Sequence, residues 1–318
     1  MIIFVRKIKL TTATYSEQRT FFYFHVLYLN INSVLIPVCF ETIILSMIKN
    51  TDKKVALFAG ALSLPFQARD ALRKNGWEVY VVGLKNFYDP ALNPDLVIRL
   101  GNGGRAAREC KKRGIHKLVF VGALGHINLS DIRPDLWSIG VLLSVLKHQR
   151  GYDSMAVAFN KALEKRGYEI VAAQDLAPEL TFEKPGIQTK TKPSKSDEAD
   201  IKRAIQVSHT IGIEDIGASV VVDKQVVAVE AAEGTARMLE RVVEMRKKRR
   251  KTGGVFAKMT KPGQDLRIDI PAIGIDTVKA VSAAHLHGII VNAKTCFVID
   301  KPAVIAAANK AKIFIKAI

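Results

Sequence analysis

Short apolar runs alternate with helical patterns along most of this chain, and that alternation limits the folds it can adopt. Residues 54–59 form an apolar run of strand length that ends at Gly60, and a helical pattern follows over residues 64–74. A second apolar run covers residues 79–84 and completes a strand–helix–strand unit. Because parallel strands must be joined by crossovers, repeated units of this kind predict a mostly parallel sheet with helices on both faces.

The alternation breaks once, and the break predicts two domains. Three prolines interrupt residues 174–198, which we interpret as a linker. Helical patterning restarts at Ser196, a candidate N-cap, and hairpin signals become more frequent beyond it. The predicted fold class is therefore α/β. It combines an N-terminal domain with a Rossmann-like parallel sheet (residues 53–173) and a C-terminal mixed α/β domain (residues 199–318).

The C-terminal domain is expected to combine a hairpin with further helices and strands. Residues 220–222 and 226–230 are β-branched runs on either side of a turn, which is typical of a hairpin. The other expected strands are 255–258, 289–292, 296–299 and 313–315, and the expected helices are 196–211, 235–251, 277–287 and 303–310.

The first 46 residues differ from the rest in composition. Residues 21–48 are rich in Phe, Tyr, Leu and Ile, but polar residues interrupt them before a 20-residue apolar span can form. Met47 offers a second place for translation to begin, and organised patterning starts at Lys53. We therefore expect residues 1–46 to lie outside the working fold, with a poor signal anchor as the alternative.

The net charge of +18 favours an anionic partner. The first 46 residues contain four basic and two acidic residues, so the remainder carries +16. Nucleic acid, anionic lipid surfaces and phosphorylated substrates all remain open at this point. Residues 246–251 are six consecutive bases, interpreted as a solvated helix end, with lipid headgroups or nucleic acid as alternatives. Three sparse cysteines without a CxxC pair suit a reducing compartment.

Candidate functional residues concentrate between Glu230 and Thr277. Glu230 ends an expected strand and Glu233 follows it, and Gly234-Thr235 opens the next helix. A helix N-terminus binds phosphate or carboxylate groups, although Thr235 acting as an ordinary cap explains the same pattern.

An acid–base–acid pattern follows in this region. In an extended chain, Asp265, Arg267 and Asp269 would share one face of a strand, because side chains alternate. Two carboxylates beside an arginine can hold a divalent ion and a phosphate oxygen, which are the groups that pyrophosphate cleavage needs. A solvent-facing edge strand with a surface ion pair is the alternative interpretation.

Together these segments resemble the LpxI family of UDP-2,3-diacylglucosamine pyrophosphatases, from about Lys53 to the C-terminus. The motifs that carry the resemblance are ALFAG (56–60), SLP (63–65), LVFVGAL (118–124), Pro134-Asp135, VVAVEAAEGT (226–235) and KPGQDLRIDIPAIGIDT (261–277). The resemblance implies hydrolysis of UDP-2,3-diacylglucosamine to 2,3-diacylglucosamine 1-phosphate and UMP. This reaction belongs to lipid A biosynthesis in Gram-negative bacteria and would use Mg²⁺ or Mn²⁺.

The resemblance also implies roles for individual residues. Asp269, and after it Asp265, are the expected catalytic and metal-binding carboxylates. The expected substrate-binding residues are Gly60, Leu64, Pro65, Glu230, Glu233, Gly234, Thr235, Lys258, Gln264, Arg267 and Thr277. The expected location is cytoplasmic, as a peripheral protein on the anionic cytoplasmic face of the inner membrane. No nucleic-acid partner is implied, and a homodimer is left open.

Two other functions stay open on the sequence. Ala236 stands where the family usually has Asp, and the glycine-rich turn is reduced to Gly60-Ala61-Leu62. Both departures favour a homologue that binds the glycolipid or an anionic membrane without turnover. A nucleic-acid-binding protein is the third reading, and the net charge alone supports it.

Overall fold

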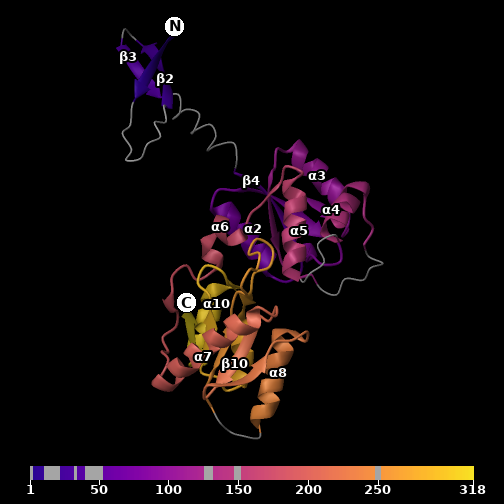
Figure 1. The fold of residues 1–318 in the computed structure, drawn as a ribbon, viewed down its shortest axis with the longest axis vertical. Coiled ribbons are helices and arrows are strands. Elements are labelled where there is room, and N and C mark those ends of the chain that lie inside the picture. The colour runs from indigo at the N-terminus through magenta and orange to yellow at the C-terminus, as the bar shows by residue number, and fades with distance from the viewer. Residues whose placement is uncertain are drawn as a thin grey trace, which may run out of the picture. The chain divides into compact units, whose positions relative to one another are not determined.

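The computed structural model describes residues 3–10, 22–31, 34–39, 53–124, 132–146, 152–247 and 252–318. They belong to two compact units, Met1–Lys54 and Val55–Ile318. The first unit contains an antiparallel sheet of β1 (Ile3–Leu10), β2 (Phe22–Ile31) and β3 (Val34–Cys39) (Figure 1). The second unit contains all the other elements.

The first sheet of the second unit has the strand order β6-β5-β4-β7-β8. Its strands are β4 (Lys54–Ala59), β5 (Glu78–Leu84), β6 (Leu96–Ile98), β7 (Lys117–Val121) and β8 (Glu169–Ile170). The pairs β5–β6, β4–β7 and β7–β8 are parallel. This arrangement confirms the predicted Rossmann-like parallel sheet.

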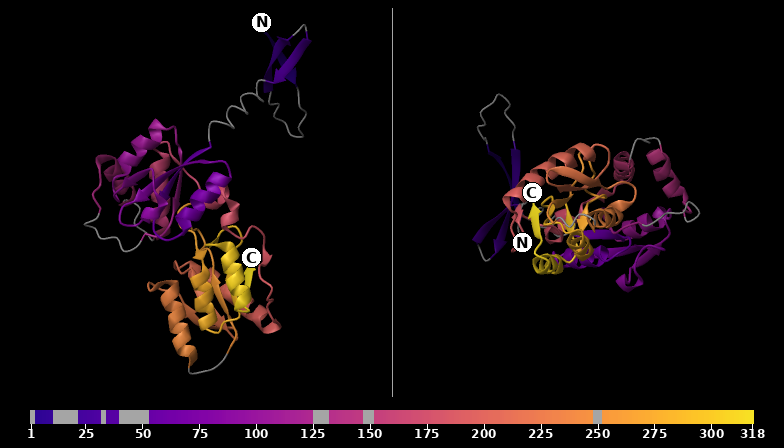
Figure 2. Two further views of the ribbon diagram at one scale, coloured as in Figure 1. Left: turned by 180° about the vertical axis from the view of Figure 1, so that it is seen from behind. Right: turned by 90° about the horizontal axis from the view of Figure 1, so that it is seen from below.

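Helices cover both faces of this sheet. Side chains alternate along each strand, so neighbouring residues of one strand pack against helices on opposite faces. Val55, Leu57 and Ala59 pack in one core cluster with α2 (Leu64–Lys74), whereas Ala56 packs in another. The second cluster contains buried residues of α3 (Gly103–Lys112), α4 (Leu136–Leu146) and α5 (Tyr152–Glu164). Figure 2 shows the helices around this sheet from two further sides.

The second sheet is mixed, as predicted, with the order β11-β10-β12-β14-β16-β9. Its strands are β9 (Gly186–Ile187), β10 (Ala218–Val222), β11 (Gln225–Val229), β12 (Val255–Lys258), β14 (Gly288–Val291) and β16 (Phe314–Ala317). β12, β14 and β16 are parallel to one another. β9 pairs antiparallel with β16, and β10 pairs antiparallel with both β11 and β12. Asp223 and Lys224 turn the β10–β11 hairpin at positive φ, the backbone geometry of a two-residue hairpin turn.

Four helices accompany this sheet: α7 (Lys195–Gly212), α8 (Gly234–Lys247), α9 (Ile275–Ala283) and α10 (Lys301–Lys310). The N-cap of α7 is Ser194 and not Ser196, the residue that the sequence suggested. Asp197 explains the shift, because its backbone N–H donates to Ser194 Oγ while its carboxylate accepts the Ser194 backbone N–H. This is a capping box.

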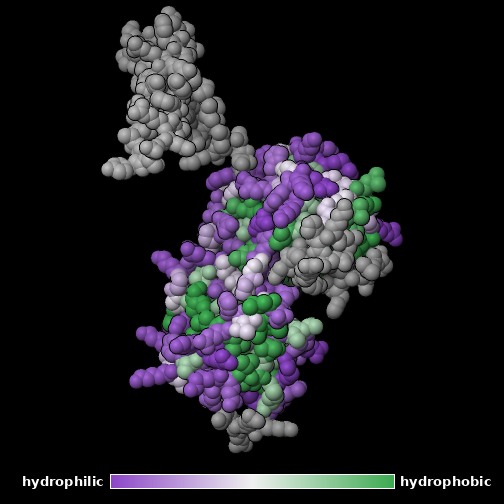
Figure 3. Space-filling view, in the orientation of Figure 1, coloured by the Kyte–Doolittle hydropathy of each residue, from purple (hydrophilic) through white to green (hydrophobic). Residues whose placement is uncertain are grey.

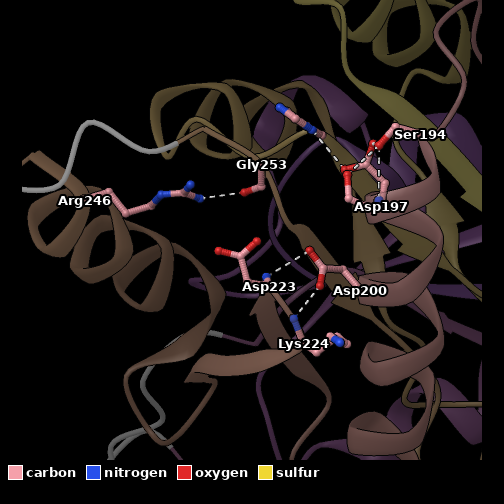
Figure 4. A network of polar contacts seen from close by, with 9 residues as sticks. Ser194, Asp197, Asp200, Asp223, Lys224, Arg246 and Gly253 are labelled. Carbon is pink, nitrogen blue, oxygen red and sulfur yellow. Dashed lines mark hydrogen bonds and ion pairs between the residues drawn. The ribbon is translucent and has the colours of Figure 1, made fainter.

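Polar contacts fasten the N-terminal ends of β12 and β14 (Figure 4). Asp197 also contacts His287 Nδ1 at 2.9 Å, and Asp200 accepts the backbone N–H groups of the hairpin turn at 3.2 and 2.6 Å. Buried Arg246 donates to the Gly253 carbonyl at 2.8 Å. Ligands of open α/β sheets bind beyond the carboxyl ends of the parallel strands, which are the opposite ends of β12 and β14.

Residues 174–198, interpreted from the sequence as a linker, contribute to both domains. They include most of α6 (Ala173–Leu176), the 3₁₀ turn Pro178–Leu180, β9 and the start of α7. Leu180 joins the core of the first sheet, and β9 pairs with β16 in the second. The prolines separate short packed elements here.

A two-stranded parallel sheet also joins the domains. β13 (Ala272–Ile273) pairs with β15 (Phe297–Val298). Phe297 is buried in the core cluster that contains β4 and α2. Residues just after the candidate catalytic segment are thus packed against the first domain.

Candidate active site

The carboxyl ends of β12 and β14 bring polar side chains together. Thr260 follows β12, and its backbone N–H and hydroxyl donate to Asn292 Oδ1 at 2.8 and 3.0 Å. Asn292 follows β14. Ligands of open α/β sheets bind beyond such strand ends. Sequence reasoning missed both residues, although a polar residue within two positions of the end of each buried parallel strand was the available signal.

Lys258, the last residue of β12, lies within a small polar cluster. Its ammonium group donates to Thr235 Oγ1 and is 3.5 Å from Glu230 Oε2, and Thr235 Oγ1 donates to Glu230 Oε1 at 2.9 Å. Gly234 has a positive φ of 80° where the chain turns into α8. The structure therefore brings Glu230 and Thr235 together around the ammonium group of Lys258, and Gly234 opens the helix that carries Thr235.

The predicted strand at residues 265–270 is wrong, because this segment forms a turn. The backbone N–H groups of Ile268 and Asp269 both donate to the Asp265 carbonyl, at 3.2 and 3.1 Å. Asp265 also accepts the Arg267 backbone N–H with its side chain at 3.1 Å. Such local side-chain bonds compete with extended structure. Asp265, Arg267 and Asp269 therefore do not share a strand face.

Asp265 is buried, with 7% of its side chain exposed, and its carboxylate is fully engaged. Arg267 Nε and Nη2 bind its two oxygens at 2.9 and 2.7 Å, and Asn160 Nδ2 donates to Oδ2 at 2.5 Å. With the Arg267 backbone N–H, these donors occupy the four acceptor positions of a carboxylate. The Arg267 guanidinium holds the pKa of Asp265 below its usual range, and Asp265 raises the pKa of Arg267.

Arg267 extends this contact to the first domain. Its Nη1 donates to Glu164 Oε1 at 2.7 Å, and Glu164 lies one turn after Asn160 on α5. Gln174 of α6 adds a bond from its Nε2 to the Leu266 carbonyl at 3.2 Å. The turn at residues 265–268 is therefore fastened to α5 and α6. The sequence did not indicate Asn160, Glu164 or Gln174.

Asp269 is the available carboxylate of the pair, with 54% of its side chain exposed. Its Oδ2 accepts a bond from Gln264 Nε2 at 2.7 Å and lies 3.4 Å from Lys261 Nζ, and Lys261 also pairs with Asp215. Among the described residues, Asp269 Oδ1 has no hydrogen-bond partner given by the geometry. Asp215, which sequence reasoning missed as a site residue, adds a second acid here.

An apolar pocket of about 820 Å³ adjoins Asp269. Side chains of β4, β7, α4, α5 and the turn line it, and Asp269 is the acidic residue among the described lining residues. Gly60 and Leu64 line it as well. A Cβ atom on Gly60 would lie 2.7 Å from the Ala123 carbonyl, so the close approach of the two strand–helix turns requires glycine there.

The other predicted site residues make local contacts. Glu233 pairs with Arg241 at 2.7 Å, and Thr277 Oγ1 accepts the Gly274 backbone N–H at 3.2 Å, at the start of α9. Pro65 is buried in the first turn of α2. In the basic run at 246–251, Arg246 is buried and bonded to Gly253, and residues 248–251 lie outside the described residues.

Thiol chemistry does not fit this site. Cys110 and Cys296 are free and buried, while Cys39 lies where side chains are not described. Burial raises the pKa of the Cys296 thiol to about 12, although Lys258 nearby lowers it. A thiol with that pKa is neutral near pH 7 and is a poor nucleophile.

A divalent ion fits only one of the two predicted carboxylates as they stand. The described part of the chain contains no group of three or more His, Cys, Asp or Glu side chains placed to hold a metal. Mg²⁺ usually takes one or two carboxylates and completes its shell with water and substrate phosphates. Asp269, with one uncommitted oxygen, fits that requirement, whereas Asp265 would first have to release Arg267 and Asn160.

These features define a two-domain α/β protein in which an acid that contacts Lys261 lies on the wall of an apolar pocket. The LpxI N-terminal domain model matches residues 54–180, and the LpxI C-terminal domain model matches residues 184–316. The chain is 33% identical over 271 residues to the UDP-2,3-diacylglucosamine pyrophosphatase LpxI of Caulobacter vibrioides, covering 83% of this chain and 96% of that protein. The chain therefore belongs to the LpxI family.

Proposed function

We propose that this chain hydrolyses the pyrophosphate bond of UDP-2,3-diacylglucosamine, giving 2,3-diacylglucosamine 1-phosphate and UMP in lipid A biosynthesis. Family membership and the named activity of the Caulobacter vibrioides relative support the proposal. The observation that carries it is the position of Asp269 on the wall of an otherwise largely apolar pocket. A diacylated sugar nucleotide needs apolar volume for its acyl chains and polar groups for its phosphates.

The reaction adds one water molecule across the phosphoanhydride. A P–O bond forms from the water oxygen to one phosphorus, and the bond from that phosphorus to the bridging oxygen breaks. In this proposal Asp269 accepts a proton from the attacking water, and Gln264 orients its carboxylate through the 2.7 Å bond. Lys258 and Lys261 offset the negative charge on the phosphoryl oxygens.

We further propose a requirement for Mg²⁺ or Mn²⁺, held by Asp269 together with phosphate oxygens of the substrate. Bound there, the ion would supply positive charge to the phosphoryl group. Asp265 as a second metal-binding or catalytic carboxylate remains a prediction. Its present contacts favour a positioning role, in which it holds the turn that places Asp269.

The predicted substrate-binding residues receive roles from their contacts. Gly60 and Leu64 form pocket wall, and Glu230 and Thr235 hold Lys258 in place. Gly234, at positive φ, turns the chain into the helix that carries Thr235. We assign supporting roles in the neighbouring structure to a second group. These residues are Pro65, Glu233, Arg267 and Thr277.

The location follows as part of the same proposal. Among the helices that the structure describes, none is long and apolar enough to cross a membrane. A substrate with two acyl chains resides in a bilayer, and the chain carries a net charge of +18. We propose a peripheral protein on the cytoplasmic face of the inner membrane.

Release of UMP from UDP-2,3-diacylglucosamine by the purified protein, with Mg²⁺ or Mn²⁺ and with EDTA, tests the proposal. We expect UMP with the ions and none with EDTA. UDP-glucosamine, which lacks the acyl chains, is the matched substrate control and should turn over far more slowly. Tight glycolipid binding without UMP would instead support a non-catalytic homologue. Salt-sensitive binding to arbitrary DNA without any effect of the lipid would support the nucleic-acid reading.

A further inference from the structure

Helix α4 separates the apolar pocket from the protein surface. Trp137, Val141 and Val145 line the pocket from one side of the helix, at the four-residue spacing of a single helix face. Arg166 lies 5.4 Å from the centre of the Trp137 ring, which holds this face inward. The pocket wall on this side is therefore one helix thick.

The other side of α4 is apolar as well, and it is exposed. Leu136, Ile139 and Leu143 follow one another at helical spacing, with between 37% and 90% of each residue exposed. Figure 3 shows hydrophobic residues at the surface over α4. Single exposed apolar residues are ordinary, but a stripe along one helix marks an interaction surface.

Helix α3 places positive charge beside this stripe. The backbone N–H of Gly103 donates to Ser138 Oγ, and that of Gly104 donates to Asp135 Oδ2, both at 2.9 Å. The first turn of α3 is therefore fastened to the first turn of α4. The exposed bases of α3 are Arg105, Arg108, Lys111 and Lys112, of which Lys112 pairs with Glu109 on the same helix.

We propose that α3 and α4 form the surface by which this protein docks on an anionic phospholipid bilayer. In this arrangement Leu136, Ile139 and Leu143 enter the apolar part of the interface, and the bases of α3 contact the phosphate headgroups. α4 has 11 residues and a span needs about 20, so the contact is interfacial.

An anionic bilayer matches both the bases of α3 and the apolar stripe of α4. Cations beside an apolar stripe complement anionic headgroups above acyl chains. The opposite side of α4 lines the apolar pocket, so volume suited to acyl chains lies directly behind this surface. That last point rests on the proposed function, but docking itself does not.

Flotation of the full chain with vesicles, without substrate, tests the docking surface. Vesicles of phosphatidylglycerol and phosphatidylethanolamine should bind the protein, and phosphatidylcholine vesicles should bind it much more weakly. Leu136→Ser with Leu143→Ser should weaken binding at least about tenfold. Arg105→Glu with Arg108→Glu should weaken binding to anionic vesicles by about fivefold or more for each charge, and added salt should reduce this difference.

Matched controls come from α7 and its C-terminus. Ile213→Ser removes an exposed apolar side chain elsewhere, and Lys202→Glu with Arg203→Glu makes the same change in net charge on another exposed helix surface. These controls should bind vesicles like the unmodified chain. Circular dichroism of every variant tests whether the fold is kept. The charge variants keep the test informative if the double leucine variant fails to fold.

Three outcomes would overturn the proposal. The first is unchanged vesicle binding by the α3 and α4 variants. The second is an equal loss of vesicle binding in the α7 controls, or a loss of vesicle binding only when the basic residues at 247–251 are replaced by neutral ones. The third is a change from dimer to monomer in the Leu136→Ser, Leu143→Ser variant with vesicle binding intact, which would make α4 a contact between copies. Vesicle binding without UMP release from detergent-dispersed substrate would instead count against the proposed activity alone.

Discussion

Replacing Asp265 by alanine should destabilise the Val55–Ile318 unit by about 2–4 kcal/mol. The Asp265 side chain is 7% exposed, and its carboxylate binds Arg267 through two nitrogens and Asn160 through one. Breaking a fully buried ion pair costs about 3–5 kcal/mol. The Arg267 side chain is 35% exposed, so water can solvate its guanidinium and offset part of this loss of free energy. Asn160 is fully buried and already has an unpaired Oδ1, so losing its partner adds about 1–3 kcal/mol.

Urea unfolding at pH 7 measures this cost as a shift in midpoint at constant slope. Asp269→Ala is the matched control, because it removes the same group from a half-exposed position four residues later. It should change stability by less than about 1 kcal/mol. Equal costs for the two variants would show that Asp265 is not fastened as the structure describes.

The pH dependence of this cost gives a second check. The Arg267 hydrogen bonds lower the pKa of Asp265 in the folded state, so its stabilising contribution is complete above the unfolded pKa of about 4. It is lost as the pH falls through the lower folded value. The stability gap between the unmodified chain and Asp265→Asn should therefore be constant from pH 5 to 7 and shrink below about pH 4. A gap that grows in acid would contradict the assignment.

Three further predictions follow from other parts of the structure. Gly288→Ala should lower the stability by about 2 kcal/mol or more in urea unfolding, because its Cβ would lie 2.1 Å from the Phe314 ring; a neutral substitution would contradict the packing of β14 on β16. Asp197→Ala should cost about 1–2 kcal/mol by thermal unfolding, since it removes the carboxylate that accepts the Ser194 backbone N–H and contacts His287; the same cost in an exposed Asp276→Ala control would contradict these contacts. Removing residues 1–46 should leave UMP release unchanged, and loss of folded, active protein would show that this segment matters.

Clear periodicity with clear ends made several elements predictable. The pattern over residues 64–74 gave α2, and that over 255–258 gave β12, with the same bounds as the structure. α4 was missed because Leu136–Leu146 is apolar around almost its whole circumference, so it lacks the one-sided pattern that indicates a helix. Residues 265–270 alternate like a strand, but the side chain of Asp265 binds local backbone and forms a turn.

Individual site residues were easier to predict than their partners. Glu230 and Thr235 were singled out in one motif and Lys258 apart from it, and the structure joins them. Asn160 and Glu164 lie on a helix about one hundred residues before Asp265 and Arg267, and no local pattern links the two segments. The opposite states of the two aspartates, one buried and one half-exposed, depend on that tertiary contact.

UMP release by an Asp269→Asn variant tests the account most directly. The substitution keeps the size of the side chain and removes the carboxylate that we propose as proton acceptor and metal ligand. Turnover should fall at least about a hundredfold. Glycolipid binding and the urea midpoint should stay close to those of the unmodified chain, and Asp276→Asn, an exposed acid on α9, should remain fully active. Normal turnover by Asp269→Asn would contradict the central claim.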